Sequence, residues 1–330
     1  MGLMARVIDS GSEHRNALAE VGDGLFVDIG DSRAKISQFW MLLVLSATIA
    51  AGGVVGDSTP AVIGAMIVAP LATPIYGVAL ATVIGSQKRL RTALLLLVSG
   101  IAVNILIGVI AGLVLTQRMP LDANPQITGR TAPTMLDLIV ALATGIAGAF
   151  ALSRRDVSNI LAGVAIAISL VPVLAVVGIT AGAGHFDLAR GESLLFLTNV
   201  AAILVAGALV FSAAGYQHEA IERDPRAARR ARALIAVFLV ALVIPLGIAS
   251  LRTSRYERYV QATSSASSAW VDGTGWRLDS VRIVGDDIVI TVLGSGPPLP
   301  IEELRSEVRK SVPARVPVQL VEESGTTTGL

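Results

Sequence analysis

Long apolar stretches separated by short polar loops make up most of the chain. A helix needs about 20 mainly apolar residues to cross the hydrocarbon core of a bilayer. Seven stretches meet this length and predict transmembrane helices over residues 36–56, 59–85, 92–116, 134–153, 157–182, 193–214 and 232–251. Residues 1–35 lack the apolar stretch of a signal peptide, and we expect them to form a cytoplasmic polar tail or an amphipathic element.

The pattern changes to shorter elements in residues 253–330. A polar segment over residues 254–270 is expected to form a helical stalk. Two segments on either side of Gly285-Asp286-Asp287 then alternate apolar and polar residues, which predicts a β-hairpin. Beyond Pro300, an amphipathic helix pattern precedes a last strand pattern, so the region predicts a small α+β domain in the order ββαβ. A domain this small is marginally stable alone, and we expect it to pair with neighbours in a homo-oligomer.

Composition supports a protein whose main partner is the lipid bilayer. Of the 330 residues, 53% are hydrophobic and 15% are charged, against about 25% charged in soluble domains. The mean hydropathy is +0.69. The formal net charge of +1 leaves no basic surplus to match nucleic-acid phosphates. With no Cys and three scattered His, the sequence predicts no disulfide, no metal site and no cofactor.

Positive charge is concentrated in alternate loops. Loops that would face one side carry twelve Lys and Arg residues, whereas the inter-helix loops of the other side carry three, which are Arg118, Arg130 and Arg190. Because cytoplasmic loops are enriched in Lys and Arg, we predict a multi-pass plasma-membrane protein with a cytoplasmic N-terminus. An odd number of crossings then places the C-terminal domain outside the cytoplasm. The twelve residues are Arg33, Lys35, Lys88, Arg89, Arg91, Arg154, Arg155, Arg223, Arg226, Arg229, Arg230 and Arg232.

An internal repeat relates the stretch that starts at Leu45 to the stretch that starts at Leu142. Acids, glycines and prolines correspond: Asp57-Ser58 with Asp156 and Ser158, Gly64 with Gly163, and the pair Pro70 and Pro74 with Ser169 and Pro172. Each repeat holds three predicted helices, so the second would enter the membrane from the opposite side, as in many secondary transporters. We therefore predict repeat one over 36–116, repeat two over 117–215, a basic loop and seventh helix over 216–252, and the C-terminal domain over 253–330.

Prolines inside the second and fifth predicted helices favour a break in each. Proline removes a backbone donor and clashes with the preceding turn, and exposed carbonyls are tolerated in a bilayer only against protein or water. The breaks either frame a pathway or are packing kinks. The candidate residues that would line a pathway are Asp57, Ser58, Pro70, Thr73, Pro74, Asn104, Asp156, Ser169, Pro172 and Asn199.

Four of these candidates have a structural alternative. Asp57 and Asp156 stand at positions that suit helix N-caps. Asn104 and Asn199 are the costliest side chains to bury without partners, and they either line the pathway or join helices by hydrogen bonds.

The function that the pattern favours is a transporter or channel for a small neutral solute or an ion. Asp137 suits the first turn of a helix, and we expect it to form a structural ion pair with Arg130. The sequence carries no nucleophile, metalloprotease or P-loop motif, so we do not expect an enzyme. One alternative is a non-transporting oligomeric scaffold or sensor whose extracytoplasmic domain binds a ligand or partner, and another is a lipid-binding membrane protein.

Three segments also resemble a known family. They are VIGAMIVAPLATPIYG from Val62, RTAPTMLDLIVALATGIAGA from Arg130 and LAGVAIAISLVPVLAVVGI from Leu161. In this order they are similar to the bacterial membrane family called domain of unknown function 389, over residues 38–215. The resemblance implies a bacterial membrane protein, and it implies no activity and no functional residue.

Overall fold

The computed structural model describes residues 15–115, 124–128, 135–157, 170–218, 233, 258–284, 287–294 and 300–324. The chain forms two compact units, Met1–Gly247 and Ile248–Leu330. All of the predicted seventh helix except residue 233, and residues 158–169 of the predicted fifth helix, lie outside the described residues.

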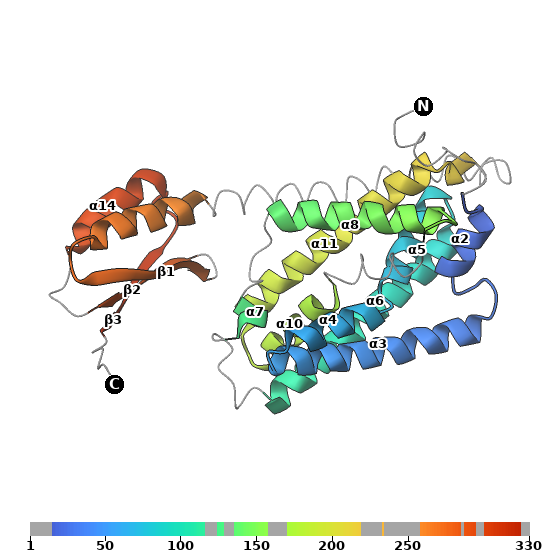
Figure 1. The fold of residues 1–330 in the computed structure, drawn as a ribbon, viewed down its shortest axis with the longest axis horizontal. Helices are drawn as coiled ribbons and strands as arrows, with labels where there is room; N and C mark the ends of the chain where they lie inside the picture. Colours follow the sequence, from blue (N-terminus) through green and yellow to red (C-terminus); the bar gives the residue numbers. More distant parts are fainter. Residues whose placement is uncertain are drawn as a thin grey trace. The chain divides into compact units, whose positions relative to one another are not determined.

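The described part of the first unit is helical (Figure 1). Among the described residues three helices, α3, α6 and α11, are long and apolar enough to cross a membrane, and the bent pair α4 and α5 makes a fourth if the two count as one span. Helices α8 and α10 are apolar but shorter. These lengths and compositions are those of a polytopic membrane fold. The elements are α2 (Leu18–Leu25), α3 (Ser32–Val55), α4 (Thr59–Val68), α5 (Ala72–Val83), α6 (Gln87–Leu115), α7 (Pro125–Thr128), α8 (Met135–Ser153), α10 (Val171–Gly182) and α11 (Phe186–Ala213).

Prolines set where α4 ends and where α5 and α10 begin. Pro70 forces the residue before it out of the helical region, and Ala69 is extended at ψ 127°. The chain resumes as α5 at an angle of 43° to α4. Pro172 lies in the first turn of α10, where its missing N–H leaves no helical bond unmade. The predicted break in the second helix is therefore present, and in the fifth the described half is a helix that starts at the proline.

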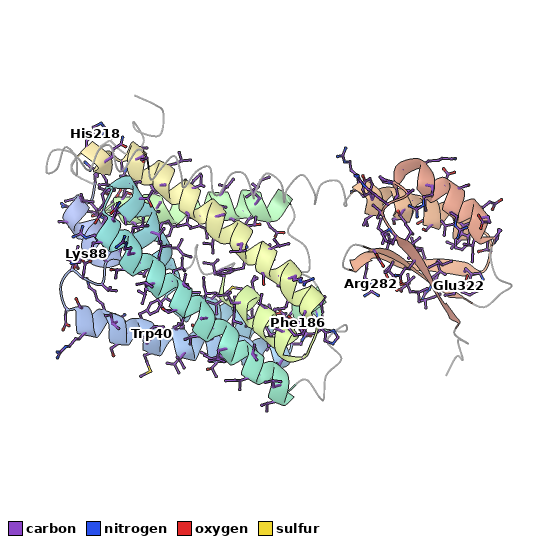
Figure 2. The ribbon with its side chains drawn as sticks, turned by 180° about the vertical axis from the view of Figure 1, so that it is seen from behind. Trp40, Lys88, Phe186, His218, Arg282 and Glu322 are labelled. Atoms are coloured by element: carbon purple, nitrogen blue, oxygen red, sulfur yellow. The ribbon has the colours of Figure 1, made fainter. Side chains whose placement is uncertain are left out.

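The same kinds of contact occur in both halves of the unit. Helix α3 packs on α6 in the first half, and α8 packs on α11 in the second. Across the halves, α10 packs on α6 and α5 packs on α11. Figure 2 shows Lys88 near the start of α6 and His218 after α11 at one end of the unit, with Phe186 at the start of α11 at the other. Helices α6 and α11 therefore run in opposite directions.

The polar N-terminal segment contains an amphipathic helix. Within α2, Leu18, Val21 and Leu25 are buried, and the helix packs against α5. Of the two expected forms, a tail or an amphipathic element, the described residues 15–31 take the second.

The second unit is a three-stranded sheet covered by helices (Figure 1). Strand β1 (Trp276–Val284) pairs antiparallel with β2 (Asp287–Gly294), which pairs parallel with β3 (Val318–Ser324). Helix α14 (Ile301–Ser311) connects the two parallel strands, as a parallel pair requires. The order of strands and helix is the ββαβ predicted from the sequence.

One expectation about this unit was wrong. The polar segment before the sheet is a helix over residues 258–271, but it does not stand apart as a stalk. Its Val271 is buried in the hydrophobic core with Ile290 and Val308, and Tyr259 and Trp270 pack against the same core. Thr263 and Ser267, two of the small polar residues that suggested a solvated stalk, are buried.

Candidate functional site

One face of α6 carries the features that stand out in the first unit. The buried positions recur every three or four residues, so they form a single stripe along the helix. The later part of the stripe, from Gly100 to Gly112, is made of glycines and one polar residue. The stripe consists of Ala93, Leu97, Gly100, Asn104, Gly108 and Gly112.

Where glycines of this stripe face glycines of α10, the backbones of the two helices are in direct contact. A Cβ on Gly108 would lie 2.8 Å from the carbonyl oxygen of Ala175, and a Cβ on Gly182 would lie 2.5 Å from that of Val109. Gly112 lies against Ile179. Because contacts advance by four residues along both helices, from Gly108 at Ala175 to Gly112 at Ile179, the two helices run parallel.

Asn104 lies one turn before this crossing and is fully buried. Neither its Oδ1 nor its Nδ2 has a hydrogen-bond partner among the described residues. The parallel register places Asn104 beside the start of α10 at Val171, where the helix begins at its proline. An unpaired buried amide costs on the order of 1–3 kcal/mol. Within the part of the chain that the structure describes, Asn104 therefore makes no hydrogen bond that joins two helices.

Asn199 lies in a different helix interface. It is 4% exposed, and its Oδ1 has no partner in the part of the chain that the structure describes. Ile203 and Ala206, one and two turns further along α11, lie against Gly145 of α8. Asn199 thus occupies the face of α11 toward α8, whereas Asn104 faces α10.

The two candidate acids, Asp57 and Asp156, are exposed in the turns that follow α3 and α8. Asp57 is exposed in a left-handed turn with φ 46°, and the N-cap of α4 is its neighbour Ser58, whose Oγ accepts from the N–H of Ala61. Asp156 is exposed and pairs with Arg154 at 2.6 Å. The capping role expected of Asp57 thus belongs to Ser58, because Asp57 takes the turn that ends α3.

The proline candidates surround the break between α4 and α5 and the start of α10. Pro74 and Pro172 are buried, whereas Pro70 and Thr73 are half-buried. Asp137 lies in the first turn of α8. The remaining candidates, Ser169 and Arg130, lie outside the described residues, and so does the predicted pair of Arg130 with Asp137.

The structure adds two buried groups that the sequence prediction missed. Glu192, in the second turn of α11, is fully buried, and Asn199 lies seven residues later on the same helix face. Glu192 stands one residue before the predicted sixth span, so it was counted with the loop. The hydroxyl of Tyr76 in α5 donates to the carbonyl oxygen of Gly145 in α8 at 2.9 Å.

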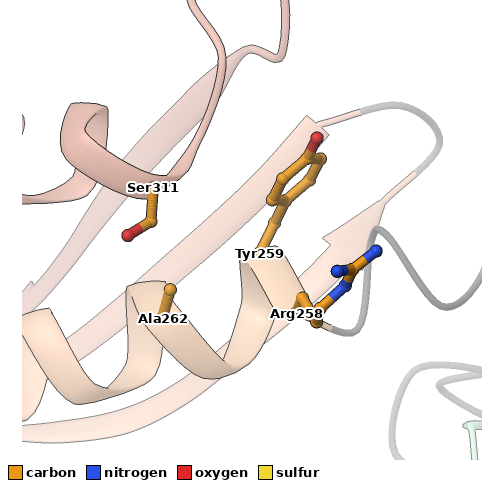
Figure 3. Close-up of a pocket in the computed structure, with 4 residues that line it drawn as sticks. All are labelled: Arg258, Tyr259, Ala262 and Ser311. Carbon is orange, nitrogen blue, oxygen red and sulfur yellow. The ribbon is translucent and has the colours of Figure 1, made fainter.

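The second unit has an open hollow lined by Arg258, Tyr259, Ala262 and Ser311 (Figure 3). Arg258 lies at its edge, where the helix over residues 258–271 begins. Among the described residues of both units, no three His, Asp or Glu side chains gather to hold a metal ion.

The chain is similar to a protein family and to a relative for which no activity is described. Residues 66–205 match the family described as "Domain of unknown function (DUF389)". An uncharacterized protein of the archaeon Methanocaldococcus jannaschii is 35% identical over 189 residues, which cover 57% of this chain and 58% of that protein. The chain thus spans less than two thirds of this relative. No solved structure matches. The family agrees with the resemblance of the sequence segments, and the bacterial origin that the resemblance implies stays untested.

Proposed function

We propose that the protein moves a small neutral solute or an ion across a membrane, along a pathway beside Asn104 between the broken helix α4–α5 and α10. The observation that carries the proposal is the fully buried amide of Asn104, whose Oδ1 and Nδ2 have no partner within the described residues. Polar side chains inside membrane helices are costly, and they either bond to a neighbouring helix or line a pathway. A transported solute that exchanges hydrogen bonds with the amide would offset this cost.

The proposed scaffold has seven transmembrane helices, in two inverted repeats of three helices plus one. Corresponding contacts support it. Gly108 of α6 meets Gly178 of α10, and 99 residues along from Gly108, Gly207 of α11 meets Ala79 of α5. Ala79 likewise precedes Gly178 by 99 residues. The repeat thus converts one cross-contact into the other, since Gly108 corresponds to Gly207 and Gly178 corresponds to Ala79.

Helix directions also support inversion. Helices α5 and α6 follow each other through a tight turn at Gly85, so they run in opposite directions. Because α10 runs parallel to α6, α10 runs opposite to its repeat partner α5. A second repeat that crosses the membrane in the reverse direction has this arrangement. Figure 1 is consistent with it, since α3 and α8 lie at opposite sides of the unit with α6 and α11 between them.

The class of solute follows from the charges near Asn104. Helix α10 carries no charged side chain, and α6 carries none between Arg91 and its end at Leu115. Desolvating a strongly hydrated ion there would be uncompensated. An amide that offers both a donor and an acceptor suits a neutral, hydrogen-bonding solute or a weakly hydrated ion.

We further propose that the protein lies in a plasma membrane as a homo-oligomer, with its N-terminus in the cytoplasm and its C-terminal domain outside. Basic side chains at the starts of α3 and α6, Arg33, Lys88 and Arg91, support this direction, because they are exposed at what would be the cytoplasmic end.

Flux into liposomes tests the function. Purified protein is reconstituted, and entry of urea and glycerol is followed by light scattering, and that of K⁺, Na⁺ and Cl⁻ by fluorescent indicators. We expect either the neutral solutes or the ions to enter faster than into protein-free liposomes, and Asn104→Leu to slow this entry by about tenfold. The same substitution should raise the thermal stability of the protein, because it removes the unpaired buried amide.

The matched control is Ser99→Ala, since the Ser99 hydroxyl donates to the carbonyl of Leu95 within its own helix at 2.7 Å. Equal flux through the Asn104→Leu protein would contradict the role of Asn104. No flux of any probe would favour the scaffold or lipid-binding alternatives.

A further inference from the structure

We propose that residues 15–31, which we call the strap, close one end of the helical unit and must detach for the pathway to open there. The proposal rests on the proposed transport function. It is carried by contacts that join the strap to both three-helix groups, the first made of α3, the pair α4–α5 and α6 and the second of α8, α10 and α11. These contacts lie at the end of the unit where Lys88 and His218 are seen (Figure 2).

The strap covers the end of α8. Arg15 and Arg154 face each other in an antiparallel bridge, and the N–H of Asn16 donates to the carbonyl oxygen of Ser153 at 3.0 Å. The side-chain Nδ2 of Asn16 donates to the carbonyl oxygen of Leu152 at 2.9 Å. These are carbonyls of the last turn of α8, which have no partner within their helix, so the strap supplies their missing donors.

The strap also holds the end of α11. The hydroxyl of Tyr216 donates to the carbonyl oxygen of Asn16 at 3.0 Å. The guanidinium of Arg15 lies over the ring of Tyr216, 4.7 Å from its centroid, an arrangement that attracts a cation to the ring face. Arg15 and Asn16 thus contact the last turn of α8 and, through Tyr216, the residues that follow α11 in the second group.

The rest of the strap lies on the first group. A Cβ on Gly77 of α5 would lie 3.2 Å from the carbonyl oxygen of Leu25, so the strap backbone rests directly on α5. Phe26 packs under the guanidinium of Arg89 at 4.8 Å, and Asp28 pairs with the same guanidinium at 3.7 Å. A movement of one group relative to the other therefore has to strain or release the strap.

The bonds that hold the strap are of a kind that can be released without unfolding. Its acids pair with bases of the helical unit: Glu20 with Arg155 at 2.7 Å and Asp23 with Lys35 at 2.9 Å, in addition to Asp28. Exposed ion pairs are individually weak and are screened by salt. Helix α2 spans only eight residues, a length that is marginal by itself. Detachment of the strap would break these exposed or half-exposed pairs and uncover one apolar face, that of Leu18, Val21 and Leu25.

The test locks the strap with a disulfide. The chain has no Cys, so Arg15→Cys with Arg154→Cys introduces the only thiols. Facing residues of an antiparallel bridge have Cα atoms about 4.5–5.5 Å apart, within the range of a disulfide. We expect oxidation to lower liposome flux by about tenfold and reductant to restore it, because a closed gate limits transport. Each single variant should be insensitive to oxidant. Oxidised protein that transports as fast as reduced protein would overturn the proposal.

A second readout separates failure of the strap from failure of transport. Glu20→Gln in the double-cysteine protein should slow disulfide formation by about threefold, because a released strap spends less time beside α8. The matched control is Glu302→Gln, which removes an exposed pair with Arg305 in the other unit and should leave the rate unchanged. If no probe enters even the reduced protein, the proposed function fails. In that case, an unchanged rate in the Glu20→Gln protein overturns the strap, and a slowed rate retains it as a detachable segment.

Discussion

Adding one methyl group at the crossing of α6 and α10 tests the packing most sharply. In Gly178→Ala, the new Cβ would lie 2.7 Å from the Cα of Gly108 and nearer still to the carbonyl oxygen of Ile105. Both neighbours are backbone atoms, so no side chain can rotate away and the helices must separate. Overpacking of this kind costs about 1–3 kcal/mol.

The expected result is a loss of about 5 °C in thermal midpoint, since 1 kcal/mol shifts the midpoint of a domain of this size by about 2–4 °C. The assay is thermal unfolding of the purified protein in detergent, followed by circular dichroism. The matched control is Gly52→Ala in α3, where a Cβ would meet nothing within 4 Å. There the better helix propensity of alanine should leave the midpoint unchanged or raise it.

An unchanged midpoint for Gly178→Ala would refute the close crossing. An equal loss for both variants would show that alanine is harmful at any glycine of these helices, and the parallel register of α6 and α10 would lose its support.

Three further predictions address other parts of the molecule. Tyr76→Phe removes the buried bond from α5 to α8 and should cost about 1 kcal/mol, measured by the same unfolding assay against Thr48→Val, whose hydroxyl bonds within its own helix. Ile290→Ala in the buried face of β2 should lower the free energy of unfolding of the C-terminal unit by about 2–5 kcal/mol. In the full chain, this unit should then become sensitive to protease while the helical unit does not, whereas Val321→Ala at an exposed position should leave both units resistant. Hydrogen bonds from Arg155 and the N–H of Ala17 lower the pKa of Glu20 below its ordinary 4.5, so its contribution to strap attachment is present above that pH and is lost as the pH falls through the lowered pKa. The hydrogen-exchange rate of strap amides, corrected for intrinsic rates, should therefore increase as the pH falls through this pKa. Glu20→Gln should abolish this pH dependence.

The sequence predicts helices well where length and hydropathy decide. The apolar stretches over α3, α6 and α11 and the break at Pro70 were all predicted, because each depends on local composition or on one proline. The four-residue spacing of Gly108 and Gly112, like that of Gly178 and Gly182, permits close helix contact, but it is a weak signal in a chain with 32 Gly. Its meaning depends on Gly178, which only the fold brings beside it.

Residues that depend on distant partners could not be predicted. Glu20 and Arg155 lie 135 residues apart, and nothing in the polar N-terminal segment indicates that its acids match the loop after α8. Asp57 was weighed as a cap because its residue type suits that role, yet the left-handed turn gives the cap to Ser58. Glu192 was counted with a loop because hydropathy windows exclude a charge at their edge, whereas burial depends on the neighbouring helices.

Opposite orientation of the two repeats is the central claim, and labelling from one side of the membrane tests it most directly. Asp57→Cys and Asp156→Cys place single thiols at exposed, equivalent turns of a chain without Cys, and Ser86→Cys marks the turn between α5 and α6. Intact cells are treated with a membrane-impermeant maleimide before and after permeabilisation. Inverted repeats predict labelling at Asp57 from outside, and at Asp156 and Ser86 only after permeabilisation. Labelling of Asp57 and Asp156 from the same side would contradict the account.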